Sequence, residues 1–162
     1  MTLPVRPPPV AVPSDPRWMR YAETILRFHA PPLSIDLRRP LAAGDRERIE
    51  ALGLGGSFGV WTAENPFGEA LDASANRGLR ERLEGELAAR GVPWRRVTAQ
   101  AGEGHHCEEC VAAAIGMAAT REMAAGLGQM AFFWFETDRF MLVGALVEAE
   151  PILLPLVPVP EA

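Results

Sequence analysis

Apolar residues recur along the chain with two different spacings, one typical of helices and one typical of strands. Close to the N-terminus they recur every three or four residues, which predicts a helix with one apolar face. The apolar positions of this helix are Trp18, Tyr21, Ala22, Ile25 and Phe28. Ser14 and Asp15 can cap the helix, Pro16 suits its first turn, and Pro31 ends it. We therefore expect an N-terminal helix that runs through Phe28.

From residue 58 onward, short apolar runs alternate with helical stripes. The expected strands cover 58–63, 94–100, 110–118, 130–136 and 139–147. One helix begins after Asp72 or Ser74 and ends before Gly91, and a second helix begins at Thr120. These elements follow one another in the order β-α-β-β-α-β, plus one extra strand.

This order predicts an α+β domain with a ferredoxin-like antiparallel sheet and an N-terminal helical extension. The strand at 131–135 is apolar at every position, which is typical of a strand that is covered on both faces. We expect it to pair antiparallel with the strand at 58–63. The two internal helices would cover one face of the sheet, and the N-terminal helix or a second copy of the chain would cover the other.

Composition fits one domain with proline-rich ends. The chain has 162 residues, of which 48% are hydrophobic and 23% are charged, as in ordinary globular domains. Proline-rich segments at 1–13 and 151–162 are interpreted as a flexible arm and a tail beside a single domain at 14–150. No segment has the apolar run of a signal peptide or of a membrane span, so we expect a cytoplasmic protein without membrane contact.

Charge and cysteine usage narrow the classes of function. The formal net charge is −5, which argues against a nucleic-acid partner because phosphate binding needs a basic patch. All 16 basic residues are arginine, so a Schiff-base lysine and the lysine of a phosphate-binding loop are both excluded. Cys107 and Cys110 lie too close together for a disulfide framework, which indicates a reducing compartment.

Four segments carry a family resemblance. They are Trp61-Thr62-Ala63-Glu64-Asn65-Pro66, then Asn76 at the head of an arginine-rich helix, then Glu108, then Leu127-Gly128-Gln129-Met130-Ala131-Phe132-Phe133-Trp134. Between about residues 58 and 147 the chain thereby resembles the bacterial family of domains of unknown function numbered 3293. Where that family is expected to have a Trp-x-Glu-Pro-Ser-Phe segment, this chain has His106-Cys107-Glu108-Glu109-Cys110-Val111. The family has no established activity, so the resemblance implies no reaction.

A cluster of histidine and cysteine is the candidate metal site. It consists of His105, His106, Cys107 and Cys110, and thiolate and imidazole ligands would suit zinc. A structural zinc site normally takes its second ligand pair from a distant segment, and His29 is the one other histidine in the chain. The alternative interpretation is a polar hairpin loop that leads into a strand. No other cofactor is expected.

A second candidate site follows from the predicted topology, which brings several loops and strand ends to one end of the sheet. The candidate ligand-binding residues gathered there are Thr62, Glu64, Asn65, Asn76, Arg77, Glu108 and Gln129. A helix N-terminus and Arg77 would favour an anion, whereas the two carboxylates would favour a cation. The alternative is that the three amide side chains cap and bridge backbone groups.

The sequence therefore favours a small binding or regulatory module whose partner is a small ligand or a protein. A metal-binding protein or metal-dependent enzyme built on the His-His-Cys-x-x-Cys loop is the first alternative. A structural protein that forms a homodimer through its sheet face is the second. No motif decides whether the chain is an enzyme.

Overall fold

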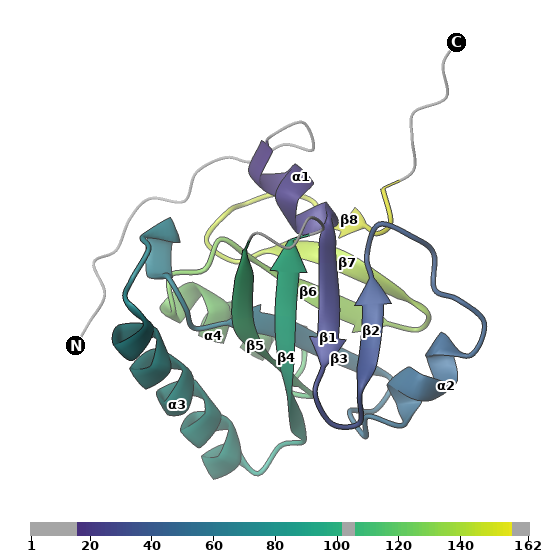
Figure 1. Cartoon of the computed structure of the whole chain (residues 1–162), viewed down its shortest axis with the longest axis horizontal. Coiled ribbons are helices and arrows are strands. Elements are labelled where there is room, and N and C mark those ends of the chain that lie inside the picture. The colour runs from purple at the N-terminus through teal and green to yellow at the C-terminus, as the bar shows by residue number, and fades with distance from the viewer. Residues whose placement is uncertain (1–15, 102–105, 157–162) are drawn as a thin grey trace.

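The computed structural model describes residues 16–101 and 106–156 (Figure 1). The strands are β1 (Thr24–Phe28), β2 (Leu33–Asp36), β3 (Ser57–Thr62), β4 (Trp94–Ala101), β5 (Cys107–Ala113), β6 (Ala131–Glu136), β7 (Arg139–Gly144) and β8 (Ile152–Leu153). The helices are α1 (Pro16–Ala22), α2 (Asp45–Glu50), α3 (Ala73–Arg90) and α4 (Met117–Gly126), with a 3-10 turn, η1, at Pro66–Gly68. The strands form one sheet in the order β2-β1-β4-β5-β3-β6-β7-β8, and every pair of neighbours is antiparallel.

The predicted ferredoxin-like fold is wrong, because the described residues form one sheet of eight strands that curls into a half-barrel. In Figure 1 the strands β2, β1, β4 and β5 run side by side in front, and β3, β6 and β7 cross behind them. The expected antiparallel pairing of β3 with β6 is present, with Phe58 opposite Phe135. The face for which an N-terminal helix or a second chain was expected is enclosed mainly by the curl of the sheet, and Trp18 and Ala22 of α1 pack into it.

The N-terminal segment forms a short helix and a strand in place of the long helix that was expected. The helix α1 ends at Ala22, and β1 then pairs with both β2 and β4. Along β1 the inward side chains Thr24, Leu26 and Phe28 are buried, and Arg27 is exposed. Apolar residues at 22, 25 and 28 also fit a helical spacing, which is why the two patterns could not be separated. The capping residues Ser14 and Asp15 lie outside the described residues, as does the segment 1–13.

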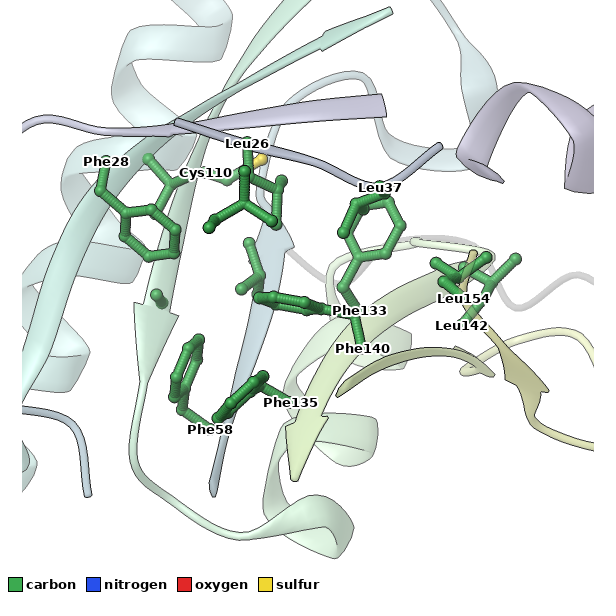
Figure 2. Packing of buried hydrophobic residues seen from close by; sticks show 14 of the residues in the cluster. Leu26, Phe28, Leu37, Phe58, Cys110, Phe133, Phe135, Phe140, Leu142 and Leu154 are labelled. Carbon is green, nitrogen blue, oxygen red and sulfur yellow. The ribbon is translucent and has the colours of Figure 1, made fainter. Parts of the chain in front are cut away.

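The concave face of the half-barrel holds the larger part of the core (Figure 2). Phe58 on β3 is fully buried and contacts three other rings, with ring centres 6.3 Å from Phe28, 5.2 Å from Phe135 and 6.1 Å from Phe140. Phe58, Phe135 and Phe140 lie on the neighbouring strands β3, β6 and β7, whereas Phe28 lies on β1, which β4 and β5 separate from β3 in the sheet. Burial of aromatic rings across the concave face therefore holds the curl together.

The edges of the sheet approach each other beside this aromatic core. Leu37, Leu142 and Leu154 are buried there, and Figure 2 shows Leu37 beside Phe140. Residues 152–153 of the proline-rich C-terminal segment form β8, which pairs with β7. The Arg46 guanidinium on α2 lies 3.1 Å from the Asp138 carboxylate in the β6–β7 turn, and this ion pair links the two halves of the sheet.

Helices α3 and α4 cover the convex face, as the two-sided apolar strand predicted. The Asp72 side chain caps α3 by accepting a hydrogen bond of 2.7 Å from the Ala75 N–H, and Gly91 ends the helix in a left-handed conformation. Helix α4 begins at Met117, three residues before the expected cap. Thr120 is instead buried against β3, where a Cβ on Gly59 would lie 2.5 Å from its methyl group. Within the described residues, no helix is long and apolar enough to cross a membrane.

Candidate functional site

A cavity of about 620 Å³ lies at one end of the concave face, between the sheet and α1. Figure 1 shows α1 above this end of the half-barrel. The sheet contributes strands β3, β4, β5 and β6 to the lining, and the loops that follow β3 and α4 close one side. The size is within the range of pockets that hold small organic ligands, about 300–1,000 Å³.

The cavity exists because the inward positions at this end carry small side chains. Along β4 the inward residues are Val97, Ala99 and Ala101, so the side chains become small as the strand leaves the aromatic core. Ala131 occupies the corresponding inward position at the start of β6. Larger residues also line the space, among them Val60 and Phe133. The result is a largely apolar space that the protein's own side chains do not fill.

Polar groups on two neighbouring strands form part of its floor. Thr62 on β3 donates a hydrogen bond of 2.7 Å to the carbonyl of Glu109, and its hydroxyl accepts one from the Glu64 N–H. The buried Glu64 carboxylate accepts a hydrogen bond of 2.7 Å from the Glu109 N–H, so it lies behind the cavity wall. Glu108 lines the cavity, and its Oε1 atom is 2.9 Å from Nε2 of His106.

The loop after β3 forms a second wall and is held by two amide side chains. The Asn76 side chain accepts a hydrogen bond from the Asn65 N–H and donates one to the Asn65 side chain, each 2.9 Å long. Asn65 has the left-handed backbone conformation, with φ of 49°, that this pair stabilises. Asn76 is therefore a support of the wall, whereas Asn65 itself lines the cavity.

The segment before β6, residues 128–129, is hydrogen-bonded to the loop that follows β3. The Phe67 N–H donates a hydrogen bond of 2.8 Å to the Gly128 carbonyl, and the Gln129 amide nitrogen donates one of 2.9 Å to the Glu64 carbonyl. A Cβ on Gly128 would lie 3.0 Å from the Pro66 ring, so the two segments pack backbone to backbone. This contact joins the Glu64-Asn65-Pro66 and Gly128-Gln129 motifs into one wall.

Helix α1 supplies the third wall, which sequence reasoning missed. Arg17, Arg20 and Tyr21 line the cavity from this helix, while Trp18 faces the core. The helical spacing of residues 17, 20 and 21 could have shown that they share a face. The apolar spacing predicts Trp18 and Tyr21 as core residues. No pattern in the sequence indicates that this helix packs against the end of β5.

Burial shifts the pKa of three groups at the cavity. Burial raises the pKa of Glu108, although its contact with His106 opposes this shift. Burial, with the nearby Glu108 carboxylate, raises the pKa of Tyr21 to about 12 and that of Cys110 well above its ordinary value. The phenol and the thiol are therefore neutral at physiological pH. Neither is an activated nucleophile, which favours binding over covalent chemistry at this cavity.

The structure brings most of the predicted ligand-binding residues to this region but not all of them to the cavity. Thr62, Asn65, Glu108 and Gln129 line it, and Glu64 and Asn76 stand directly behind the wall. Arg77 is exposed on α3 and does not line it.

The three predicted metal ligands within the described residues, His106, Cys107 and Cys110, do not form a metal site. Cys107 and Cys110 are three residues apart on β5, so their side chains point to opposite faces of the sheet. Cys107 is exposed and Cys110 is buried in the core of the concave face. His106 pairs with Glu108, and His105 lies outside the described residues. Among residues 16–101 and 106–156, no group of three or more potential ligands could hold a metal ion.

Comparison with known proteins supports the family resemblance. Residues 61–132 match the model of a family described as "Protein of unknown function (DUF3293)". The matched segment runs from Trp61 on β3 to Phe132 on β6 and includes both motifs of the loop wall. No curated protein and no solved structure matches the chain.

Proposed function

We propose that this protein binds a small organic molecule inside the concave face of its sheet. The observation that supports the proposal is the cavity of about 620 Å³ with an apolar body and a few convergent polar groups. A protein without a ligand to hold would gain stability by filling that space, since closely packed interiors are the rule. Small residues at 99, 101 and 131 keep it open instead.

The groups that face the cavity suit recognition of a ligand. The Tyr21 hydroxyl has no hydrogen-bond partner among the described residues, and the Gln129 amide uses its nitrogen for the wall but not its oxygen. These groups could donate to and accept from a polar end of a ligand. Val60, Phe133 and the alanines would contact its apolar part. The binding role that the sequence favoured is thus assigned to this cavity, and a regulatory role would follow only from the identity of the ligand.

Filling the cavity tests this proposal. Ala99→Phe places a ring in the cavity, whereas Gln100→Phe adds the same ring on the opposite face of the same strand. Octanol, a neutral eight-carbon probe, should bind the wild type and Gln100→Phe in calorimetric titrations, and Ala99→Phe should lose this binding. Equal octanol binding by all three proteins would contradict the proposal. Thermal unfolding of each variant checks that the fold is retained.

A cytoplasmic location belongs to the same proposal. Its support is that Cys107 and Cys110 are both free thiols, one exposed and one buried, on opposite faces of β5. The location of a tagged chain in its own cells, by fractionation, tests this part separately.

A further inference from the structure

We infer that the ligand of this cavity carries a carboxylate, held by Arg20 and Arg17 of α1, with an apolar body that extends over the inward alanines. This inference rests on the proposed function and names its ligand class. The first support is the placement of charge. Arg17, Arg20, His106 and Glu108 are the charged or titratable side chains among the described lining residues, apart from neutral Tyr21 and Cys110. Both arginines come from α1, whereas Glu108 in the lining and Glu64 behind it come from the opposite side of the cavity.

This positive lining stands out against the charge of the whole chain, which is −5. Some surface arginines pair with carboxylates, as Arg38 does with Asp36 at 2.9 Å and Arg96 with Glu84 at 2.9 Å. Arg20 makes no ion pair within the described part of the chain. Its guanidinium is therefore free to bind an anion, and guanidinium and carboxylate groups match in geometry and charge.

Two carboxylates oppose the arginines, Glu108 in the lining and Glu64 behind it, and both lie on the side of the cavity away from α1. Glu108 contacts His106 at 2.9 Å, so part of its charge is already compensated on the β5 side. Burial raises the pKa of Glu108, although its contact with His106 opposes this shift. The Tyr21 hydroxyl, which stays protonated, can donate a hydrogen bond to a ligand carboxylate.

The remaining lining residues determine the chemistry of the part of the ligand that carries no charge. Ala99, Ala101 and Ala131 provide small apolar contacts, and Met130 and Phe133 provide larger ones. Apolar surface of this kind binds aliphatic or aromatic carbon and gives no partner to a second charge. The chemistry that fits is a monocarboxylate with one charged end, in preference to a diacid or a sugar phosphate.

Three eight-carbon probes test the inference: octanoate, octanol and octylammonium, each titrated calorimetrically into the full chain at one ionic strength. Octanoate should bind at least tenfold more tightly than octanol, which corresponds to about 1.4 kcal/mol, and octylammonium should bind least. Arg20→Gln, alone or with Arg17→Gln, should remove most of the preference for octanoate and leave octanol binding unchanged. Arg27→Gln removes an equal charge from the convex side of β1 and should leave the preference intact.

The outcomes separate the two proposals. Octanol binding that Ala99→Phe abolishes, without tighter binding of octanoate, overturns the carboxylate inference and leaves the cavity as a binding site. Tightest binding of octylammonium also overturns it, because Glu108 would then dominate. Full octanoate preference in the double Arg17→Gln, Arg20→Gln variant shows that the arginines do not hold the carboxylate. Absence of binding for all three probes contradicts both proposals.

Discussion

The two ends of the concave face share strands β1, β3 and β6 but are filled in opposite ways. At one end, rings from β1, β3, β6 and β7 meet around Phe58, which is fully buried. At the other end, β4 and β6 present Ala99, Ala101 and Ala131, and a cavity of about 620 Å³ remains. Backbone curvature is shared by both ends, so side-chain volume alone decides which becomes core and which becomes a pocket.

The difference shows where the stability of the fold and its proposed activity reside. The aromatic end joins distant strands and should carry most of the free energy of unfolding that depends on the concave face. The open end should tolerate changes of volume and be sensitive to changes of charge.

Removal of the central ring should cause the largest loss. Phe58→Ala should lower the free energy of unfolding by about 3–5 kcal/mol, the usual cost of truncating a large buried aromatic residue. Urea denaturation measures this change. Met130→Ala, at the wall of the open end where the side chain is half-buried, is the matched truncation and should cost much less. Equal losses for the two variants would show that the ends do not differ in packing.

Added volume should have opposite consequences at the two ends. Ala112 points inward on β5 within the packed core and is fully buried, so Ala112→Leu should overpack it and lower the free energy of unfolding by about 1–3 kcal/mol. Ala99→Leu extends into the cavity and should change that free energy by less than about 1 kcal/mol, because new apolar contacts offset the lost space. The denaturation midpoints of the two variants, each compared with that of the wild type, measure these changes in the free energy of unfolding. A cost at position 99 as large as that at 112 would mean that the cavity is not open.

The smallest expected effect concerns pH. Burial raises the pKa of Glu108 in the folded protein above its ordinary value, so the folded state binds its proton more tightly than the unfolded state does. The stability linked to this proton is fully present below the ordinary glutamate pKa of about 4.3 and is lost as pH rises through the raised pKa. Glu64, Tyr21, Cys110 and His106 act on this carboxyl and remain in place in Glu108→Gln.

The wild type should therefore lose more stability than Glu108→Gln as the pH is raised over that window. Thermal midpoints of both proteins, measured in parallel buffers, give the difference. Parallel pH profiles for the wild type and the variant would show that Glu108 is as well solvated in the folded protein as in the unfolded one.

Most elements after residue 56 could be predicted because each has an unambiguous local signal. Asp72 and Gly91 mark the ends of α3, and the unbroken apolar run of β6 indicates a strand covered on both faces. The N-terminal segment could not be predicted, because residues 22 to 28 satisfy both a helical and a strand spacing. Pairing of β1 with β4 decides between them, and that pairing is a contact between residues about 70 positions apart.

The curl of the sheet had no local signal either, because β1 and β2 at one edge and β8 at the other were not predicted as strands. Part of the candidate site was nevertheless predictable. Thr62, Asn65, Glu108 and Gln129 lie at strand ends and in loops that the neighbouring strands bring together. Arg17 and Arg20 were missed because their position depends on where α1 lies against the curl, and His106 was assigned to a metal site although it pairs with Glu108.

The packing of Gly128 against Pro66 has a consequence for how such chains diverge. Gly128 has a φ of 71° and leaves no room for a Cβ, because the Pro66 ring lies 3.0 Å and the Phe67 nitrogen 3.1 Å from where that atom would stand. A residue with a side chain could replace Gly128 only in a homologous chain in which the turn at residues 66–67 had already changed its position. Although more than 60 residues separate them in the chain, the two segments should be inherited as one unit, and substitutions in them should occur in pairs.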